Sequence, residues 1–156
     1  MNLKTKIRVR SSLLLLALAL AGRAGPAGAD VGTGVGADSL RPTGKVVLGK
    51  KMTLTPLYIT NTGTETTTYR ISLDPSVVTP GAKALPKTWV VFAGTQVTLA
   101  PKSAVYVKAA MKVPSGTKNG KYRSYVIVTS VPTAGVSGAG AAAATDVVVQ
   151  VGPVPK

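Results

Sequence analysis

Alternation of apolar and polar side chains is the clearest pattern in the chain, and it is strongest over residues 104–113. One set of alternate positions there is wholly apolar: Val105, Val107, Ala109, Met111 and Val113. The positions between them form the other set: Tyr106, Lys108, Ala110 and Lys112. A period of two residues places successive side chains on opposite faces of a β-strand. The pattern therefore predicts a strand with one face in a core and the other in solvent.

From residue 45 onward the chain continues as short β-rich runs separated by turn residues. Eight segments are predicted to be strands: Lys45–Leu48, Met52–Thr60, Thr66–Leu73, Thr88–Phe92, Gln96–Leu99, Ala104–Val113, Tyr122–Val131 and Asp146–Val151. Strands this short and closely spaced are typical of an antiparallel β-sandwich or barrel. Asn61-Thr62-Gly63 and Lys118-Asn119-Gly120 predict hairpin turns, because Asn and Gly tolerate positive φ. The sequence thus predicts an all-β domain.

Two segments lack the strand pattern. The chain from Asp30 to Gly44 is rich in glycine, contains Pro42 and has little apolar content, which predicts a flexible lead-in. The stretch Pro132–Thr145 consists of small residues, and its glycines and proline raise the entropic cost of order, which predicts a mobile loop. The β-domain is accordingly expected at residues 45–152, with residues 153–156 as a tail.

The first 29 residues have the three parts of a secretory signal peptide. Four basic residues provide the charged start: Lys4, Lys6, Arg8 and Arg10. The apolar run Leu13–Ala21 follows, and Ala27-Gly28-Ala29 offers the small side chains that a signal peptidase accepts, so cleavage before Asp30 is predicted. An uncleaved anchor or a buried helix is the alternative, although a bilayer span needs about 20 residues. We expect a secreted protein of the periplasm, cell surface or medium, with no transmembrane segment after cleavage.

Positive charge narrows the class of partner. Residues 30–156 hold 14 basic against five acidic side chains, a difference of +9. The basic residues are dispersed and aromatic residues are scarce, which argues against nucleic acid as a partner. Anionic cell-envelope polymers, lipid headgroups and acidic protein faces fit an exported basic protein better, while solubility alone would also account for the charge. The candidate anion contacts are Lys45, Lys50, Lys51, Lys108, Lys112, Lys121 and Arg123.

Residues that usually carry catalysis are rare. The chain has no His and no Cys, which excludes imidazole and thiolate metal sites, the usual nucleophile–base pairs and disulfides. The five acids outside the leader are scattered and form no calcium loop: Asp30, Asp38, Glu65, Asp74 and Asp146. A carboxylate pair or a Ser–Lys pair assembled in three dimensions is the route left to an enzyme. We expect no catalysis, no cofactor and no metal.

The only tryptophan of the chain, Trp89, lies inside a β-rich run. A lone tryptophan in such a run usually packs in the core, and Trp89 is predicted to lie there. Carbohydrate stacking is the alternative role for this side chain.

The order of these segments resembles a pattern of bacterial immunoglobulin-like domains. The residues that carry the resemblance run from Val46-Val47-Leu48 and Leu57–Gly63 through Tyr69–Leu73, Trp89, Val97–Pro101 and Val105–Pro114 to Gly120–Ser124. The chain over Asp38–Gly152 is similar to the first domain of periplasmic pilus chaperones and to single-domain relatives attached to secreted or cell-wall proteins. The resemblance implies an immunoglobulin-like antiparallel β-sandwich of seven to eight strands.

The resemblance also implies a role in protein contact, in the assembly or attachment of a surface structure. Strand addition to a sheet edge, by a partner protein or by self-association, is the expected route, and the proposed contact edge is the last strand, at Val147, Val149, Gln150 and Val151. The alternatives are an edge protected by the lead-in, a domain that binds anionic polysaccharide through its charge, and an enzyme of unrecognised type.

Two features differ from the pilus chaperones. Those proteins have a second domain, whereas this chain ends at Lys156. They also hold the terminal carboxylate of a subunit with a basic pair. Lys45 stands near the first position of that pair, and Val147–Val151 contains no lysine for the second.

Overall fold

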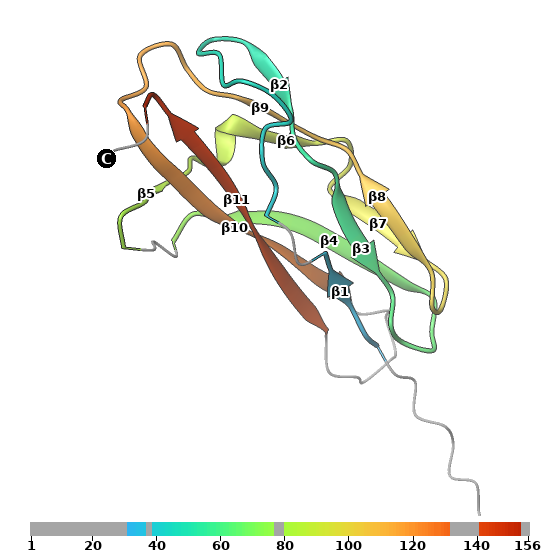
Figure 1. Ribbon diagram of the computed structural model, residues 1–156. Helices are drawn as coiled ribbons and strands as arrows, with labels where there is room; N and C mark the ends of the chain where they lie inside the picture. Colours follow the sequence, from blue (N-terminus) through green and yellow to red (C-terminus); the bar gives the residue numbers. More distant parts are fainter. Residues whose placement is uncertain (1–30, 37–38, 77–79, 132–140, 154–156) are drawn as a thin grey trace, which may run out of the picture.

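The computed structural model describes residues 31–36, 39–76, 80–131 and 141–153. These residues form two packed layers of β-strands, and their only helical element is the 3₁₀ turn η1 (Lys87–Trp89) (Figure 1). The prediction of an all-β sandwich is confirmed. Within the described part of the chain, no helix has the length and apolar character needed to cross a bilayer. The predicted signal peptide and its cleavage site lie outside the described residues.

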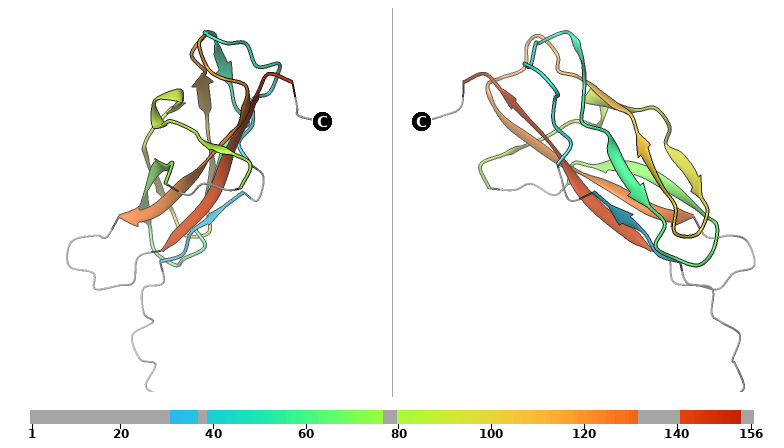
Figure 2. Two further views of the ribbon diagram at one scale, coloured as in Figure 1. Left: turned by 90° about the vertical axis from the view of Figure 1, so that its left-hand side faces the viewer. Right: turned by 45° about the vertical axis from the view of Figure 1, so that its right-hand side comes forward.

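The first layer consists of two three-stranded sheets, and every strand pairing in it is antiparallel. Two continuous stretches of the chain each contribute one strand to each sheet. One sheet has the order β1 (Gly34–Val35), β3 (Leu57–Thr60), β8 (Ala104–Val107). The other has the order β2 (Lys51–Thr53), β9 (Ala109–Lys112), β6 (Val90–Phe92). Because β2 leads into β3 and β8 leads into β9, the two sheets follow one another along the layer (Figure 2).

The second layer is a five-stranded sheet. Its order is β11 (Ala142–Val151), β10 (Gly120–Val131), β4 (Thr67–Asp74), β7 (Gln96–Leu99), and β5 (Lys83–Ala84) adds to β10 in parallel. The longest ladder joins β10 to β11, from Gly120 opposite Val151 to Thr129 opposite Ala142. β11 therefore lies at one edge of this layer, next to β10, and these two are the longest of the described strands.

Alternate side chains of both layers fill the space between them. On β10, Tyr122, Ser124, Val126 and Val128 are buried, while the residues between them are partly exposed. Trp89 is buried, and its ring lies 4.9 Å from that of Tyr122, centroid to centroid. The predicted core position of Trp89 is confirmed. Burial of aromatic and branched side chains on both inner faces is what holds a sandwich without disulfides together.

A β-bulge separates the two sheets of the first layer. Three residues, 54–56, stand opposite two residues, 108–109, on the facing strand. The extra residue coincides with Pro56, which has no N–H to give to the ladder. In a regular strand, two residues six positions apart lie on the same face. Because the bulge adds one residue, Lys51 faces solvent whereas Leu57 faces the core. The facing strand keeps one alternation throughout.

Several predicted element boundaries were wrong. Lys45–Leu48 is an irregular segment and turn before β2, and η1 replaces the first part of the predicted strand Thr88–Phe92. The bulge divides both long predicted strands, Met52–Thr60 and Ala104–Val113. The two predicted hairpin turns instead carry the chain from one layer to the other, between β3 and β4 and between β9 and β10. β11 starts at Ala142, inside the predicted loop, of which residues 132–140 lie outside the described chain.

The lead-in is ordered where it is described, contrary to the prediction. Its glycines recur every second residue, at Gly32, Gly34 and Gly36, within β1 and on either side of it. A Cβ at Gly34 would lie 2.8 Å from the Cγ2 of Thr60, so glycine allows β1 to approach β3. Leu40 is 1% exposed and belongs to the core. The sandwich therefore begins well before residue 45.

Candidate functional site

β11 offers one outer edge, and the lead-in covers the middle of it. The N–H of Leu40 donates to the carbonyl of Asp146 at 2.7 Å, and the N–H of Val148 donates to the carbonyl of Leu40 at 3.0 Å. These two bonds form a parallel bridge between Leu40 and Val147. The alternative that the lead-in protects this edge thus holds for its centre.

Beyond the bridge, the end of β11 faces outward. Backbone groups along a strand alternate in direction, so Gln150 presents its N–H on the same side as Val148, away from β10. Among the described residues, no backbone partner meets this N–H. The side chain of Gln150 lies over the strand end, where Nε2 donates to the carbonyls of Val151 at 3.3 Å and Pro153 at 3.4 Å. The free part of the edge is therefore short.

A hollow of about 350 Å³ lies beside this strand end. It exists because the chain leaves β11 after Leu40 and crosses to the other layer, where Pro42 bridges Leu54. Lys121 faces the hollow and stands directly opposite Gln150 in the β10–β11 ladder. The lining residues are Arg41, Pro42, Gly44, Val46, Lys121, Val148 and Gln150. The hollow thus combines two cations with apolar walls.

The predicted contact residues divide between core and surface. Val147, Val149 and Val151 are at most 1% exposed, and their side chains fill the sandwich. Gln150 and Val148 are the partly exposed residues of this stretch. A partner at this edge would meet backbone groups and these two side chains.

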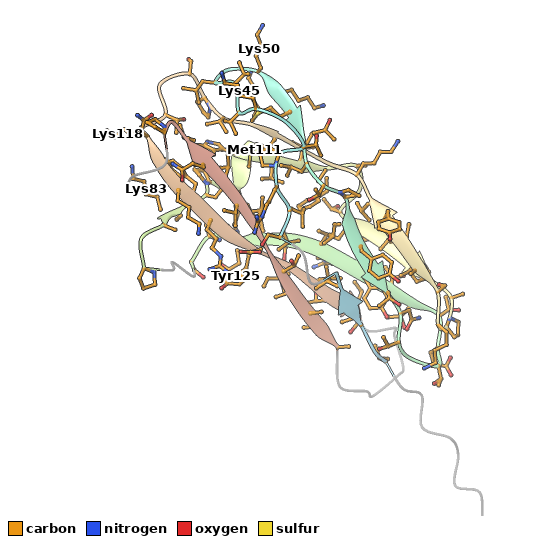
Figure 3. All side chains as sticks on the ribbon, in the orientation of Figure 1. Lys45, Lys50, Lys83, Met111, Lys118 and Tyr125 are labelled. Carbon is orange, nitrogen blue, oxygen red and sulfur yellow. The ribbon has the colours of Figure 1, made fainter. Side chains whose placement is uncertain are left out.

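The candidate anion contacts do not form one site. Lys51, Lys108 and Lys112 share the outer face of the first layer, whereas Lys121 and Arg123 lie on the outer face of the second. Lys45 and Lys50 lie at the end of the molecule where β2 begins (Figure 3). Arg123 is occupied, because its Nε donates to Asp146 at 2.6 Å and its guanidinium lies 5.1 Å from the ring centroid of Tyr125.

Comparison with known proteins yields structural neighbours only. The sequence matches no protein-family profile and no curated protein. Among solved structures, the ASH/PapD-like domain 7 of human CEP192 superposes with a TM-score of 0.56 at 12% identity, covering 79% of this chain and 87% of that domain. The Escherichia coli chaperone DraB superposes with a TM-score of 0.50 at 10% identity over 78% of this chain. The fold is a PapD-like immunoglobulin-like β-sandwich.

The chain spans about half of the DraB chain, 55%. Identities of 10% and 12% establish the fold and nothing about partners. The expectation of an immunoglobulin-like sandwich resembling a pilus-chaperone domain is therefore confirmed as a fold.

The PapD-like sandwich brings two acids into one row that the sequence did not place together. Asp74 on β4 and Asp146 on β11 both stand opposite Tyr125 of β10, one on each side. Asp146 is paired with Arg123. The carboxylate of Asp74 accepts hydrogen bonds from the Ser76 hydroxyl at 2.6 Å and the Ser76 N–H at 2.9 Å, and these bonds lower the pKa of Asp74. Both carboxylates thus have structural partners in the turn and ladder.

Within the described ranges, no three metal-binding side chains come together. The three acids of that part of the chain are Glu65, Asp74 and Asp146, and none of them lines the hollow beside β11 or the two hollows near Trp89.

Sequence reasoning missed an aromatic pair on the PapD-like sandwich. Tyr58 of β3 and Tyr106 of β8 are directly opposite in the ladder, and their ring centroids lie 5.0 Å apart with planes inclined at 49°. Tyr106 is 67% exposed. The outward alternation of residues 104–112 placed Tyr106 on the surface, but its pairing with Tyr58 depends on the bulge, which the sequence pattern did not reveal.

Proposed function

We propose that this protein is an exported, non-catalytic contact module that binds an extended segment of a partner protein in the assembly or attachment of a surface structure. The observation that carries the proposal is the end of β11, where an outward-facing backbone position at Gln150 adjoins the hollow lined by Arg41 and Lys121. An added strand gains affinity from main-chain hydrogen bonds and specificity from pockets for its alternate side chains.

The chemistry of the hollow defines the partner segment. Its apolar walls, Val46 and Val148, suit a branched aliphatic side chain. Arg41 and Lys121 suit an acidic group at the end of the same segment, because opposite charges in a partly enclosed hollow attract more strongly than in bulk water. The bridge at Leu40 limits the added strand to the last residues of β11.

Replacement of Gln150 tests the proposal. Proline at this position removes the outward N–H and blocks pairing, yet keeps the β10 ladder because that N–H faces away from β10. The probe is a short synthetic peptide of alternating valine and threonine with a C-terminal glutamate. Binding measured by titration calorimetry is expected to weaken about tenfold or more in Gln150→Pro, through a lost hydrogen bond and a steric block.

Gln150→Ala is the matched control, because it keeps the backbone donor and removes the side chain. It is expected to bind the peptide as the unmodified protein does, and all three proteins should melt within a few degrees of one another. Equal binding by the proline and alanine variants, or no binding of the peptide by the unmodified protein, would contradict strand addition at this edge.

A further inference from the structure

The outer face of the first layer carries a row of exposed aromatic and cationic side chains, which we call the tyrosine–lysine face. Its members are Tyr58, Tyr106, Lys108, Lys51 and Lys112. From this arrangement we infer that the face binds a linear, carboxylate-bearing polysaccharide. The site is separate from the end of β11, which belongs to the other layer.

The two tyrosines form the aromatic part of the face. Tyr106 is 67% exposed, and among the aromatic rings of the described chain it packs on its neighbour Tyr58 alone. Gly36, which follows β1, lies beside Tyr58, and a Cβ there would come within 3.3 Å of the Tyr58 Cβ. Because glycine stands there, bare backbone flanks the ring and leaves access to it.

The lysines continue the row from the tyrosines. Lys108 follows Tyr106 by two residues on the same face, and Lys112 follows by six, a distance of about 20 Å along an extended strand. Lys51 stands directly opposite Lys112 in the ladder. Like charges opposite one another destabilise a sheet, so this pair costs stability unless an anion lies between them.

Among the residues that the structure describes, the lysines of the face have no acidic partner. In the part of the chain that the structure describes, the only ion pair is Arg123 with Asp146, on the other layer. None of the strands that form this layer, β1, β2, β3, β6, β8 and β9, contains an acid. The charge of the face is therefore available to a ligand.

Two hollows lie at the lysine end of the face. They have volumes of about 270 and 500 Å³, and both are lined by Thr88, Trp89 and Lys112. Val91, which is 62% exposed, and Ala110 line the smaller hollow together with Lys51. Aromatic and apolar surface beside an ammonium group suits the apolar face of a sugar ring that bears a carboxylate.

The length and chemistry of the face favour an acidic polysaccharide over other anions. A span of about 20 Å between the tyrosine pair and Lys112 exceeds a single small ligand and fits a polymer. Lysine ammonium groups attract carboxylates and phosphates alike, so the choice of a polysaccharide rests on the aromatic and apolar walls of the hollows beside Lys112, which suit a sugar ring. The tyrosine rings are inclined at 49°, so they do not offer parallel platforms for successive nucleobases.

Three defined probes test the inference by titration at low and moderate salt: hexagalacturonate, its methyl ester and a short thymidine oligonucleotide. Hexagalacturonate is expected to bind, with an affinity that falls as salt rises, because exposed charges are screened. The methyl ester keeps the sugar rings and removes the charge, and it should bind at least about tenfold more weakly. Absence of hexagalacturonate binding, equal binding of the ester, or tighter binding of the oligonucleotide would overturn the inference.

Variants locate the site. Tyr106→Ala should weaken hexagalacturonate binding about tenfold through lost stacking, and the double change Lys51→Gln with Lys112→Gln should reduce its salt dependence. Tyr125→Ala and Lys118→Gln are matched controls, because Tyr125 lies on the other layer and Lys118 lies beside the start of β10 (Figure 3). Binding unaffected by Tyr106→Ala, or equally reduced by the controls, would place the ligand elsewhere.

Discussion

Asn61 shows how a single polar residue joins the two layers. Its side chain is fully buried, and its Nδ2 donates to the carbonyls of Glu65, Leu99 and Ala100 at 2.7, 3.1 and 3.2 Å. Its Oδ1 accepts the N–H of Gly63 at 2.9 Å. Buried carbonyls at a crossing between layers have no ladder to join, so the amide serves as their donor.

Replacing Asn61 with alanine should destabilise the protein by about 3 kcal/mol, because buried backbone carbonyls lose their donor and the amide leaves a small void. Asn119→Ala is the control, since Asn119 is exposed in the turn before β10 and its change should cost about 0.5 kcal/mol or less. Urea unfolding followed by tryptophan fluorescence compares the two. Similar midpoints for both variants would refute the role given to Asn61.

At the scale of elements, the lead-in connects the core, the edge strand β11 and the other layer. Leu40 inserts into the core and also bridges β11 through two backbone hydrogen bonds. The adjacent Pro42 bridges Leu54 in the other layer. A segment that bonds to both layers closes the side of the sandwich and determines how much of β11 stays open.

Leu40→Ala is accordingly expected to lower the free energy of unfolding by about 2–5 kcal/mol, as for other buried leucines. Leu48 provides a matched control, because it is 36% exposed in the turn before β2 and its change to alanine should cost about 0.5 kcal/mol or less. Chemical denaturation measures the unfolding free energy of both variants, and the m-value is expected to stay unchanged. If the lead-in were flexible, as the composition suggested, the two substitutions would lower the free energy of unfolding by similar amounts.

Sequence patterns predicted the strands whose alternation is unbroken. They failed where the bounds of a strand depend on its pairing with a distant strand. The faces of residues 104–113 followed from their side chains alone, because the strand keeps one alternation through the bulge. The bulge at residues 54–56 arises from pairing with a distant strand, and so the division of Met52–Thr60 was not visible locally. The glycines at 32, 34 and 36 suggested flexibility, although their period of two reflects close approach to β3.

The candidate sites were harder to predict than the fold. Charge alone selected seven cations, yet the two layers separate them, and Arg123 is already paired. The hollow at Arg41 and the pairing of Tyr58 with Tyr106 both depend on which strands become neighbours. Such contacts between distant residues have no signature in composition or period.

At the scale of the whole molecule, the two layers present different outer surfaces. The second layer has an edge with a short open end beside a basic hollow, and the first has the tyrosine–lysine face. A protein segment at the edge and a polysaccharide on the face would occupy separate surfaces. The proposed export of the chain would expose both to partners outside the cytoplasm.

Amide hydrogen exchange of β11 tests the open edge most directly. The N–H of Val148 is bonded to Leu40, whereas that of Gln150 faces outward, so Gln150 should exchange at least about tenfold faster after correction for sequence effects. Addition of the alternating valine–threonine peptide should then slow exchange at Gln150 and leave Val148 unchanged. Equal protection of the two amides in the free protein would contradict an edge available for strand addition.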